Sequence, residues 1–314
     1  MDLYKFQAVG QKLPPFDYDI IKRLSEEKDY IVNPALERAI NLALYLGQPL
    51  LLTGEPGTGK TELARHLANH FSSGGTPVPL HTFNTKTTSV ASDLFYRYDS
   101  LGHFQYAQNN QEKLTTTDIE EQFLRYQALG LAIKSGIRCI VLIDELDKAP
   151  RDLPNDILDV MAHLSFEVPE LGYVDGKRIK TTPENRPIVI ITSNSEKNFP
   201  DAFLRRCIFY NIPFPDEQTL TQIIQRKVSK FSEEHLSLIV KHFFKIRQIC
   251  IKKEPATAEL LQWVIVLEKL QEAGRLNPAD LASPTNEKIR EELYDTYSVL
   301  VKNKEDLKLV LEKL

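Results

Sequence analysis

The sequence predicts an α/β fold with a parallel five-stranded sheet that carries helices on both faces, followed by a smaller all-helical domain. Three observations support this prediction. Short apolar runs alternate with segments of helical period in the first two thirds of the chain, as in sheets built from βαβ units. Strand-like runs stop after Pro213 and Pro215, and helical periods follow. The length of 314 residues suits two domains better than one core.

Five segments have the apolar character of strands. Residues 139–143 are five consecutive apolar residues, which suits a strand buried on both faces of a parallel sheet. Residues 166–182 alternate around an Asp175-Gly176 pair, and this pattern predicts a hairpin outside the sheet. The predicted strands of the sheet are residues 50–52, 78–83, 139–143, 187–192 and 207–212.

Helix signals lie between and after these strands. Asn33 and Pro34 predict a helix start, as N-cap and first helical residue, and Gly47 ends that helix. Asp118 is expected to cap a helix that ends near Gly136. The remaining predicted helices are 152–164, 216–228, 232–250, 257–273 and about 285–314. The predicted domains are residues 1–213, which include an unassigned segment 1–30, the helical domain 214–275, and a helical C-terminal extension 276–314.

The stretch LLTGEPGTGKTELARHLA, residues 51–68, predicts a phosphate-binding loop between a strand and a helix. Gly54, Gly59, Lys60 and Thr61 fill the pattern G-x-x-x-x-G-K-[ST]. Glycines let the backbone approach a ligand closely, and the loop N–H groups with the following helix N-terminus bind anions. Lys60 is expected to reach the β- and γ-phosphates, and the Thr61 hydroxyl to bind Mg²⁺. The residues expected to contact the nucleotide here are Gly54, Glu55, Pro56, Gly57, Thr58, Gly59, Lys60, Thr61 and Glu62.

Two acidic residues, Asp144 and Glu145, follow the strand at 139–143. Ligands of open parallel sheets bind at the carboxyl ends of the strands. Asp144 is therefore expected to hold Mg²⁺ through water, and Glu145 to orient and deprotonate an attacking water. Asn194 follows the strand at 187–192, and its amide is expected to position the same water near the γ-phosphate.

Two adjacent arginines, Arg205 and Arg206, lie between a short helix and the last strand, and taken alone they are surface residues. The phrases GEPGTGKT, VLIDELDK, ITSN and FPDAFLRRC occur in this order and are followed by helices. With this ordered set the chain resembles an AAA+ ATPase over about residues 30–270. It is similar in particular to the MoxR group, because KAPRDLPNDIL, SFEVPE and LFYRYDSLGHFQYAQ resemble members that accompany von Willebrand A domain proteins.

The resemblance implies a P-loop NTPase fold of the AAA+ type, ATP and Mg²⁺ as cofactors, and nucleotide-linked rings, usually hexamers. It implies that Asn194 is sensor 1 and that Arg206 is the arginine finger, acting in catalysis with Lys60 and Glu145. It also implies that Tyr30 and Ile31 flank the adenine.

One departure from the family concerns the sensor-2 arginine, which AAA+ lids often carry at the start of the third lid helix. The corresponding segment, residues 254–268, has no Lys or Arg, and the aligned position is near Ala258. Lys252 and Lys253 are candidate substitutes, although they precede the helix. Lid closure is therefore expected to respond weakly to the γ-phosphate, unless a neighbouring subunit supplies the charge.

The composition limits the classes of function. The net charge of −4 gives no global basic field for nucleic acid. No apolar run approaches the ~20 residues of a membrane helix, and the first residues have no signal-peptide core, so a cytoplasmic protein without membrane insertion is expected. The three cysteines are far apart and predict neither a metal site nor a disulfide framework, and Cys139 and Cys207 are expected to be buried thiols.

The combined prediction is Mg-dependent ATP hydrolysis at the subunit interfaces of a homo-oligomeric ring. Hydrolysis would drive chaperone-like remodelling or activation of a protein partner, such as a von Willebrand A domain protein. The alternative is a nucleic-acid-dependent motor or restriction-type GTPase of the same fold, and a nucleotide kinase is more distant. A non-catalytic nucleotide binder is disfavoured by the intact pair Asp144 and Glu145.

Each of three surface features has two alternative interpretations. Cations of the predicted hairpin grip a substrate in a ring pore or are simply solvated; they are Lys177, Arg178 and Lys180. Aromatic residues form a substrate loop or pack locally; they are Phe95, Tyr96, Tyr98 and Phe104. The apolar face of the tail helix packs on the helical domain or binds a partner; its residues are Leu307, Val310, Leu311 and Leu314.

Overall fold

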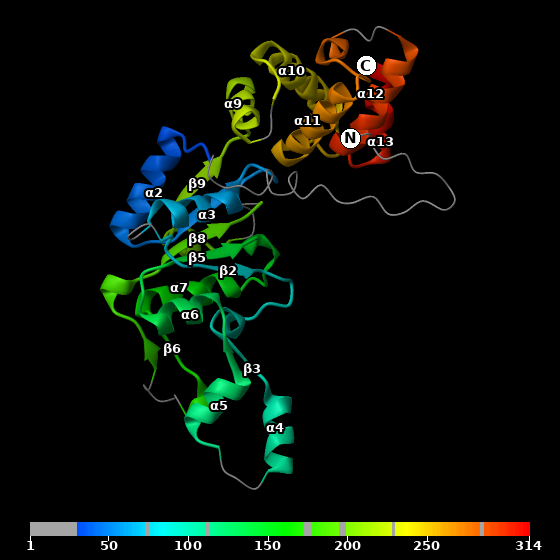
Figure 1. The fold of residues 1–314 in the computed structure, drawn as a ribbon. Coiled ribbons are helices and arrows are strands. Elements are labelled where there is room, and N and C mark those ends of the chain that lie inside the picture. The colour runs from blue at the N-terminus through cyan, green and yellow to red at the C-terminus, as the bar shows by residue number, and fades with distance from the viewer. Residues whose placement is uncertain are drawn as a thin grey trace. The chain divides into compact units, whose positions relative to one another are not determined.

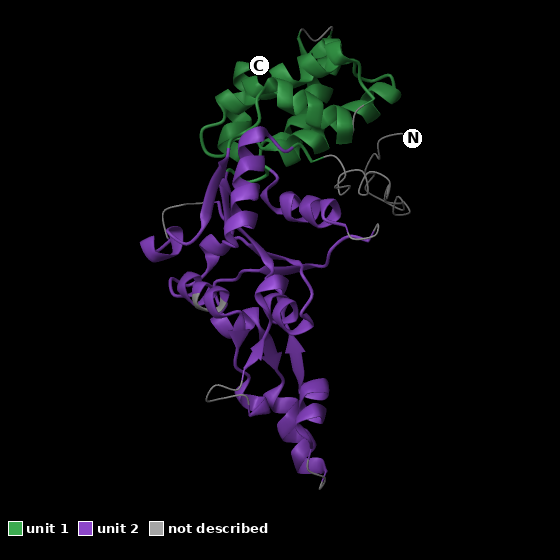
Figure 2. Ribbon diagram, turned by 90° about the vertical axis from the view of Figure 1, so that its left-hand side faces the viewer, with its two compact units in different colours: residues 1–31, 55–58, 213–314 green, residues 32–54, 59–212 purple. Residues whose placement is uncertain are grey.

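The computed structural model describes residues 30–72, 76–110, 114–172, 178–194, 199–227, 230–282 and 286–314, with the backbone alone at 159 and 160. The chain divides into two compact units, which are coloured separately in Figure 2. Unit 2 contains residues 32–54 and 59–212. Unit 1 contains residues 1–31, 55–58 and 213–314. Each unit is described by itself below.

The centre of unit 2 is a parallel sheet of five strands (Figure 1). Its strands are β1 (Leu50–Gly54), β2 (Leu80–Asn84), β5 (Ile140–Asp144), β8 (Ile188–Thr192) and β9 (Ile208–Ile212). Their order across the sheet is β2-β5-β8-β1-β9, and every pairing is parallel. This confirms the predicted α/β class, and the parallel arrangement places all five carboxyl ends along one edge.

Helices cover both faces of the sheet. The helices α2 (Pro34–Leu46) and α3 (Lys60–His70) lie on one face, and α6 (Ala128–Ser135) and α7 (Leu153–His163) on the other (Figure 1). Val141 and Ile143 of β5 belong to the core that α6 and α7 share. The alternate residues of β5, such as Leu142, are equally buried on the opposite face. Burial on both faces explains why this strand is a continuous apolar run.

The helix α2 begins and ends where its sequence predicts. The Asn33 side chain accepts a hydrogen bond from the Leu36 N–H at 2.8 Å, and Gly47 ends the helix in the left-handed conformation. Asn33 Oδ1 also accepts the Tyr210 hydroxyl at 3.0 Å, so the capping residue links α2 to β9.

A segment of several short elements connects β2 to α6. They are the 3₁₀ turn η1 (Ala91–Leu94), β3 (Tyr96–Tyr98), α4 (Ser100–Asn109), α5 (Thr116–Phe123) and β4 (Leu124–Tyr126). The single helix predicted from Asp118 to near Gly136 is wrong, because β4 separates α5 from α6 and pairs antiparallel with β3. Asp118 is in fact the third residue of α5, at position N3 of a capping box whose N-cap is Thr115.

The close approach of α6 to Phe95, the residue between η1 and β3, depends on one glycine. A Cβ built on Gly130 would lie 1.8 Å from the Phe95 carbonyl oxygen, so no other residue fits there without a backbone shift. Phe95 is buried and stacks on Phe166, and Tyr96 donates a hydrogen bond to Glu170 at 2.9 Å. These aromatic residues therefore pack locally, whereas Phe104 on α4 is exposed.

The predicted hairpin is present as a short antiparallel pair, β6 (Ser165–Phe166) with β7 (Ile179–Lys180). Two 3₁₀ turns, η3 (Pro169–Leu171) and η4 (Pro183–Asn185), flank β7 in the chain. The Asp175-Gly176 pair and Lys177 lie outside the described residues. Arg178 forms an ion pair with Glu167, with 3.0 Å between Nε and Oε1, and Lys180 is exposed.

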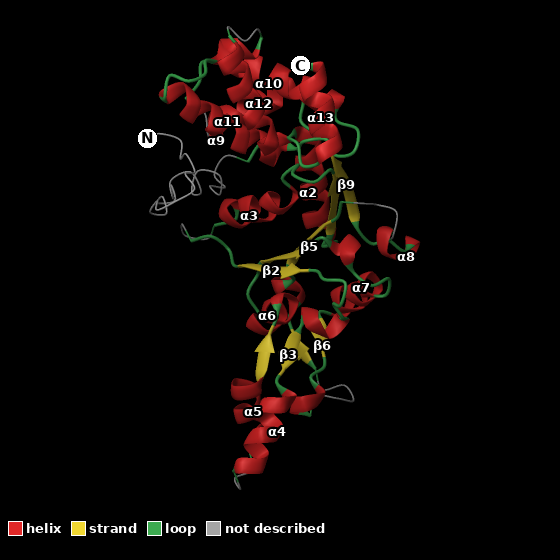
Figure 3. Ribbon diagram, turned by 90° about the vertical axis from the view of Figure 1, so that its right-hand side faces the viewer, coloured by secondary structure: helices red, strands yellow, loops and turns green. Residues whose placement is uncertain are grey.

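All regular elements described in unit 1 are helices (Figure 3). They are α9 (Glu217–Lys227), α10 (Glu233–Ile249), α11 (Thr257–Glu272), the 3₁₀ turn η5 (Pro278–Leu281), α12 (Glu287–Leu300) and α13 (Lys304–Lys313). Trp263 of α11, Phe243 of α10 and Tyr297 of α12 are fully buried in one shared core. Val310 of α13 belongs to it as well, so the boundary predicted between residues 275 and 276 falls inside this core.

The core of unit 1 encloses a hydrogen-bonded polar group. His242 Nε2 lies 2.6 Å from the Tyr297 hydroxyl, and Nδ1 lies 3.1 Å from the Leu281 carbonyl oxygen. Burial lowers the pKa of His242 from 6.5 to about 4, against the opposing effect of the Leu281 hydrogen bond. The imidazole is therefore neutral at pH 7, and both ring nitrogens have partners.

A carboxylate ties α13 to the loop between α10 and α11. Burial of Asp306 opposes its ionisation, but hydrogen bonds from Asn303, Ile251, Lys253 and Lys252 outweigh it and lower the pKa of the carboxyl. Three consecutive backbone N–H groups are thus satisfied by one side chain.

Candidate functional site at the carboxyl edge of the sheet

The phosphate-binding loop begins where β1 ends, at Gly54, and reaches α3 at Lys60. Gly54 and Gly59 have φ angles of 141° and 86°, a region in which side chains with a Cβ are strained. Lys60 Nζ donates a hydrogen bond to the Gly54 carbonyl oxygen at 2.9 Å, and the lysine is only 7% exposed. The backbone turn, the buried cation and the N-terminus of α3 together fit a polyphosphate group.

Three oxygen-bearing side chains meet beside this loop. Thr61 Oγ1 lies 3.0 Å and 3.2 Å from the two carboxylate oxygens of Asp144, which ends β5. Thr192, the last residue of β8, donates to Asp144 Oδ1 at 2.5 Å. A hydroxyl and a carboxylate are the oxygen donors that Mg²⁺ prefers, so the pair Thr61 and Asp144 fits the predicted metal. Thr192 was missed by the sequence analysis, although its position directly before Ser193-Asn194 at a strand end was a usable signal.

Glu145 has an unusual backbone. Its φ is 55°, in the left-handed region, and its N–H donates to Thr192 Oγ1 at 2.9 Å. The hydrogen bond to Thr192 stabilises this uncommon conformation, and such conformations cluster at functional sites. The carboxylate pairs with Lys148, with 2.5 Å between Oε2 and Nζ. The hydrogen bond that Lys148 donates to Glu145 raises the pKa of Lys148, so this lysine stays protonated.

Asn194 and Asp147 meet just past the strand ends. Asp147 lies in the 3₁₀ turn η2 (Leu146–Lys148), and its Oδ1 accepts the backbone N–H of Asn194 at 3.2 Å. Asn194 is exposed, and the residues that follow it, 195–198, lie outside the described part of the chain. The role predicted for the Asn194 amide stays a prediction. Asp147 and Lys148 were not singled out from the sequence.

Both arginines of the predicted finger are exposed. They follow α8 (Asp201–Leu204), whose Phe203 is fully buried and fixes the segment against the core. Within the described residues, the structure gives neither Arg205 nor Arg206 a side-chain hydrogen bond or ion pair. Exposure therefore does not distinguish the two, and the choice of Arg206 stays a prediction.

The middle of the phosphate-binding loop, residues 55–58, belongs to unit 1. Thr58 is buried, and its hydroxyl donates to the Glu55 carbonyl oxygen at 2.9 Å. A Cβ built on Gly57 would lie 3.8 Å from the Cβ of Ala258, so the start of α11 contacts the loop at the position aligned with the missing arginine. Lys252 and Lys253 are exposed, and Lys252 Nζ pairs with Glu305 at 3.6 Å.

The other predicted contacts of the nucleotide have mixed placement. Glu62, in the first turn of α3, pairs with Arg65 at 3.3 Å. Pro56 is exposed. Tyr30 and Ile31 are half-buried residues of unit 1, and their predicted contact with adenine stays a prediction.

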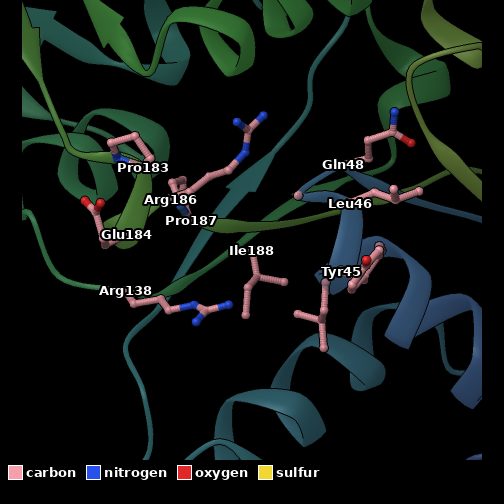
Figure 4. Close-up of a pocket in the computed structure, with 12 residues that line it drawn as sticks. Tyr45, Leu46, Gln48, Arg138, Pro183, Glu184, Arg186, Pro187 and Ile188 are labelled. Atoms are coloured by element: carbon pink, nitrogen blue, oxygen red, sulfur yellow. The ribbon is translucent and has the colours of Figure 1, made fainter.

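A cavity of about 340 Å³ lies at the opposite ends of the strands (Figure 4). Gln48 precedes β1, Arg138 precedes β5, and Ile188 begins β8, so this cavity is on the amino edge of the sheet. Its walls include Tyr45 and Arg186, and none of the predicted site residues lines it. Ligands of open parallel sheets bind at the carboxyl edge, so we place the site at the phosphate-binding loop and not at this cavity.

Other classes of site are not supported by the described residues. They contain no group of three or more His, Cys, Asp or Glu side chains arranged for a metal ion. None of the helices in this part of the chain combines the length and the apolar character that crossing a membrane requires. The three cysteines are free and buried, and burial raises the pKa of the Cys207 thiol to about 12.

A comparison with protein families decides the assignment. The model of the AAA domain, dynein-related subfamily, matches residues 49–207, just over half of the chain. The chain belongs to this AAA domain family. The match spans β1, the phosphate-binding loop, Asp144, Glu145, Asn194 and both arginines. This AAA protein is an ATPase.

Comparisons with individual proteins add little. No curated protein sequence matches the chain. Domain III of the replication initiation protein DnaA from Thermotoga maritima is similar at 14% identity and a TM-score of 0.46, covering 92% of this chain and 100% of that chain. The FIGL-1 AAA domain in complex with ADP is similar at 17% identity and a TM-score of 0.43, covering 95% of this chain and 96% of that chain. The family assignment rests on the sequence match.

Proposed function

We propose that the protein hydrolyses ATP with Mg²⁺ at the subunit interfaces of a homo-oligomeric ring, usually a hexamer, and uses the cycle to remodel a protein partner. The observation that best supports the chemistry is the junction of Thr61, Asp144 and Thr192 beside the buried Lys60. The resemblance of the sequence to the MoxR group supports a protein partner, with von Willebrand A domain proteins as the class.

The residues of the junction have distinct roles in this proposal. Lys60 binds the β- and γ-phosphates, and Thr61 with Asp144 holds the metal. When bound, Mg²⁺ neutralises charge on the phosphate oxygens. Glu145 orients the attacking water and takes its proton. Lys148, which pairs with Glu145, fixes the carboxylate, and Thr192 fixes the backbone beneath it.

Arg206 completes the site of the neighbouring subunit in this proposal. Phosphoryl transfer spreads negative charge over the γ-phosphate oxygens, and an arginine fork meets that charge. The exposed guanidinium of Arg206, on a segment anchored by the buried Phe203, supports a role outside its own subunit. An arginine finger increases the rate by roughly 10³–10⁵. Arg206→Ala should therefore abolish hydrolysis while ATP binding survives, and Arg205→Ala should have a much smaller effect.

A mixing experiment tests the interface. Arg206→Ala keeps its own Glu145, and Glu145→Gln keeps its own Arg206, so each protein alone is inactive. Mixed rings contain some sites with both groups, and ATPase activity should return when the two proteins are combined. Exchange of fluorescently labelled subunits verifies that mixed rings form. Absence of activity in verified mixed rings means that Arg206 does not act in trans.

A further inference from the structure

Arg247, in the last turn of α10, is a buried cation with several partners in unit 1. Its side chain is only 8% exposed. One guanidinium nitrogen, Nη1, donates to the Pro255 carbonyl oxygen at 2.7 Å. The guanidinium carbon lies 3.7 Å from the centre of the Phe214 ring. Burial of an arginine is costly unless its donors are satisfied, so these contacts fix the guanidinium in one orientation.

The second nitrogen of the guanidinium binds two carboxylates. Nη2 lies 2.5 Å from Glu55 Oε2 and 2.7 Å from Glu254 Oε2. Glu254 precedes α11, whereas Glu55 is the first residue after Gly54 in the phosphate-binding loop. Both carboxylates are about half exposed, so the two ion pairs are chemically alike and differ in what they attach to Arg247.

A second contact acts on the same part of the loop. A Cβ built on Gly57 would lie 2.9 Å from the Cβ of Ala256, and Gly57 has a φ of 78°. The loop backbone therefore packs directly on the residue that precedes α11. Residues 55–58, which carry both contacts, belong to unit 1, while Gly54 and Gly59 on either side belong to unit 2. These two flanking residues are glycines with positive φ, which can adopt a wider range of backbone angles than other residues.

We propose that Arg247 is a positioning residue for the phosphate-binding loop: by holding Glu55 it sets the backbone of residues 55–58, and hence the affinity of the loop for nucleotide phosphates. The N–H groups of a loop bind phosphate only when they converge, so a change in the loop backbone changes affinity. The sequence alone directed attention to Ala258, Lys252 and Lys253. Among the described residues of the helical unit, Arg247 is a cation that contacts the loop, and it does so through the carboxylate of Glu55.

Neutralising Glu55 has two opposing effects on the affinity for nucleotide. Glu55 carries a negative charge near the phosphates, so its neutralisation should favour binding on electrostatic grounds alone. If Glu55 also anchors the loop to Arg247, Glu55→Gln should instead weaken binding. The anchoring effect must vanish when Arg247 is absent, which leaves only the electrostatic effect.

A double-mutant cycle in the full chain separates the two effects. The Kd of ADP is measured by calorimetry, at fixed Mg²⁺ and salt, for the wild type, Glu55→Gln, Arg247→Gln and the double variant. Glu55→Gln should raise Kd by about fivefold in the wild-type background, at the low end of typical coupling because Glu55 is half exposed. In the Arg247→Gln background the same change should leave Kd unchanged or lower it.

Glu254→Gln is the matched control, because it removes the other carboxylate on the same nitrogen and should leave the Kd of ADP near the wild-type value. Arg247→Lys keeps the charge but not the planar fork, and it replaces Arg247→Gln in the cycle if the glutamine variant does not fold. An equal effect of Glu55→Gln in both backgrounds would overturn the proposal. So would a Glu254→Gln effect as large as that of Glu55→Gln.

The inference rests on nucleotide binding and not on the proposed ring or partner. A failed subunit-mixing experiment would leave the Arg247 cycle unaffected. A cycle without coupling would equally leave the action of Arg206 in trans unaffected.

Discussion

Polar side chains gather in two regions of this protein, and they are arranged differently. At the carboxyl edge of the sheet, Asp144 and Thr192 are fixed by hydrogen bonds, while Glu145 beside them is half-buried and Asn194 is exposed. In the core of unit 1, His242 is buried with a partner at each ring nitrogen. One region keeps polar groups available to a ligand, and the other closes them off.

This difference shows how a polar group with a shifted pKa should be interpreted. A buried polar group with every partner supplied by the chain stabilises one arrangement of the fold. A polar group at a strand end that is hydrogen-bonded on one side and exposed on the other can still bind a substrate. The low pKa of His242 therefore indicates a structural residue, although perturbed pKa values are often taken as signs of a functional site.

The largest expected effects come from substitutions at the carboxyl edge of the sheet. Lys60→Ala should abolish binding of ATP, because the buried cation nearest the phosphates is removed. Glu145→Gln should bind ATP and lose turnover by roughly 10²–10⁴, because an amide cannot take the proton of the water. Calorimetry gives binding and phosphate release gives turnover. Arg65→Ala, which removes a half-buried cation of the same helix, serves as the control. Wild-type hydrolysis by Glu145→Gln would show that the base is another group.

The next largest effect concerns the stability of unit 1, whose core contains His242. The pKa of His242 is about 4 in the folded chain, against about 6.5 when unfolded, so the unfolded state binds more protons between these values. The stabilisation is complete above pH 6.5 and is lost as pH falls towards 4. It amounts to about 3 kcal/mol for a difference of this size.

Urea denaturation of unit 1, followed by Trp263 fluorescence from pH 4 to 7.5, measures this loss. His242→Gln removes the titrating group, so the part of the pH dependence between 4 and 6.5 should disappear. Asp306 affects the pH dependence of stability only at lower pH. Its pKa is lowered in the folded chain, so the stabilisation it provides is lost as pH falls through this lowered pKa. The same slope in wild type and His242→Gln would assign the pH dependence to other groups.

The smallest expected effect tests whether the start of α11 faces the nucleotide. Ala258 is exposed at the start of α11 and contacts the loop at Gly57. Ala258→Arg places a cation there and should change the ratio of ATP to ADP affinity by a few fold, because only ATP carries the γ-phosphate. Binding of both nucleotides is compared in a Glu145→Gln background, with Ala258→Gln as the uncharged control. An unchanged ratio would mean that the start of α11 does not face the γ-phosphate.

The sheet and the caps of α2 were predictable because their signals are local. Five apolar residues at 139–143 require burial on both faces, and Asn33, Pro34 and Gly47 each favour one backbone position. The break between α5 and α6 was not predictable from local signals. It is caused by the pairing of β4 with β3, which lies much earlier in the chain, with Tyr96 opposite Tyr126 and Tyr98 opposite Leu124. Helical period cannot reveal such a contact.

The candidate site was predictable to the same degree. The loop motif and the acidic pair have fixed spacing, so Lys60, Thr61, Asp144 and Glu145 were found from the sequence. Thr192 and Lys148 were not, because their importance depends on which strands are neighbours and on the backbone of Glu145. Arg247 was also missed, since 192 residues separate it from Glu55.

The participation of α13 in the core of unit 1 has a consequence for the order of events during translation. Domains generally fold as units while the chain emerges from the ribosome, the N-terminal ones first. The strands of the sheet are complete once Ile212 has emerged, but the helical unit lacks Val310 and the carboxylate of Asp306 until almost a hundred more residues follow. Its interior is therefore exposed for longer on the nascent chain, and a premature stop codon before residue 306 should leave a sheet unit attached to an incompletely packed helical segment that attracts proteases.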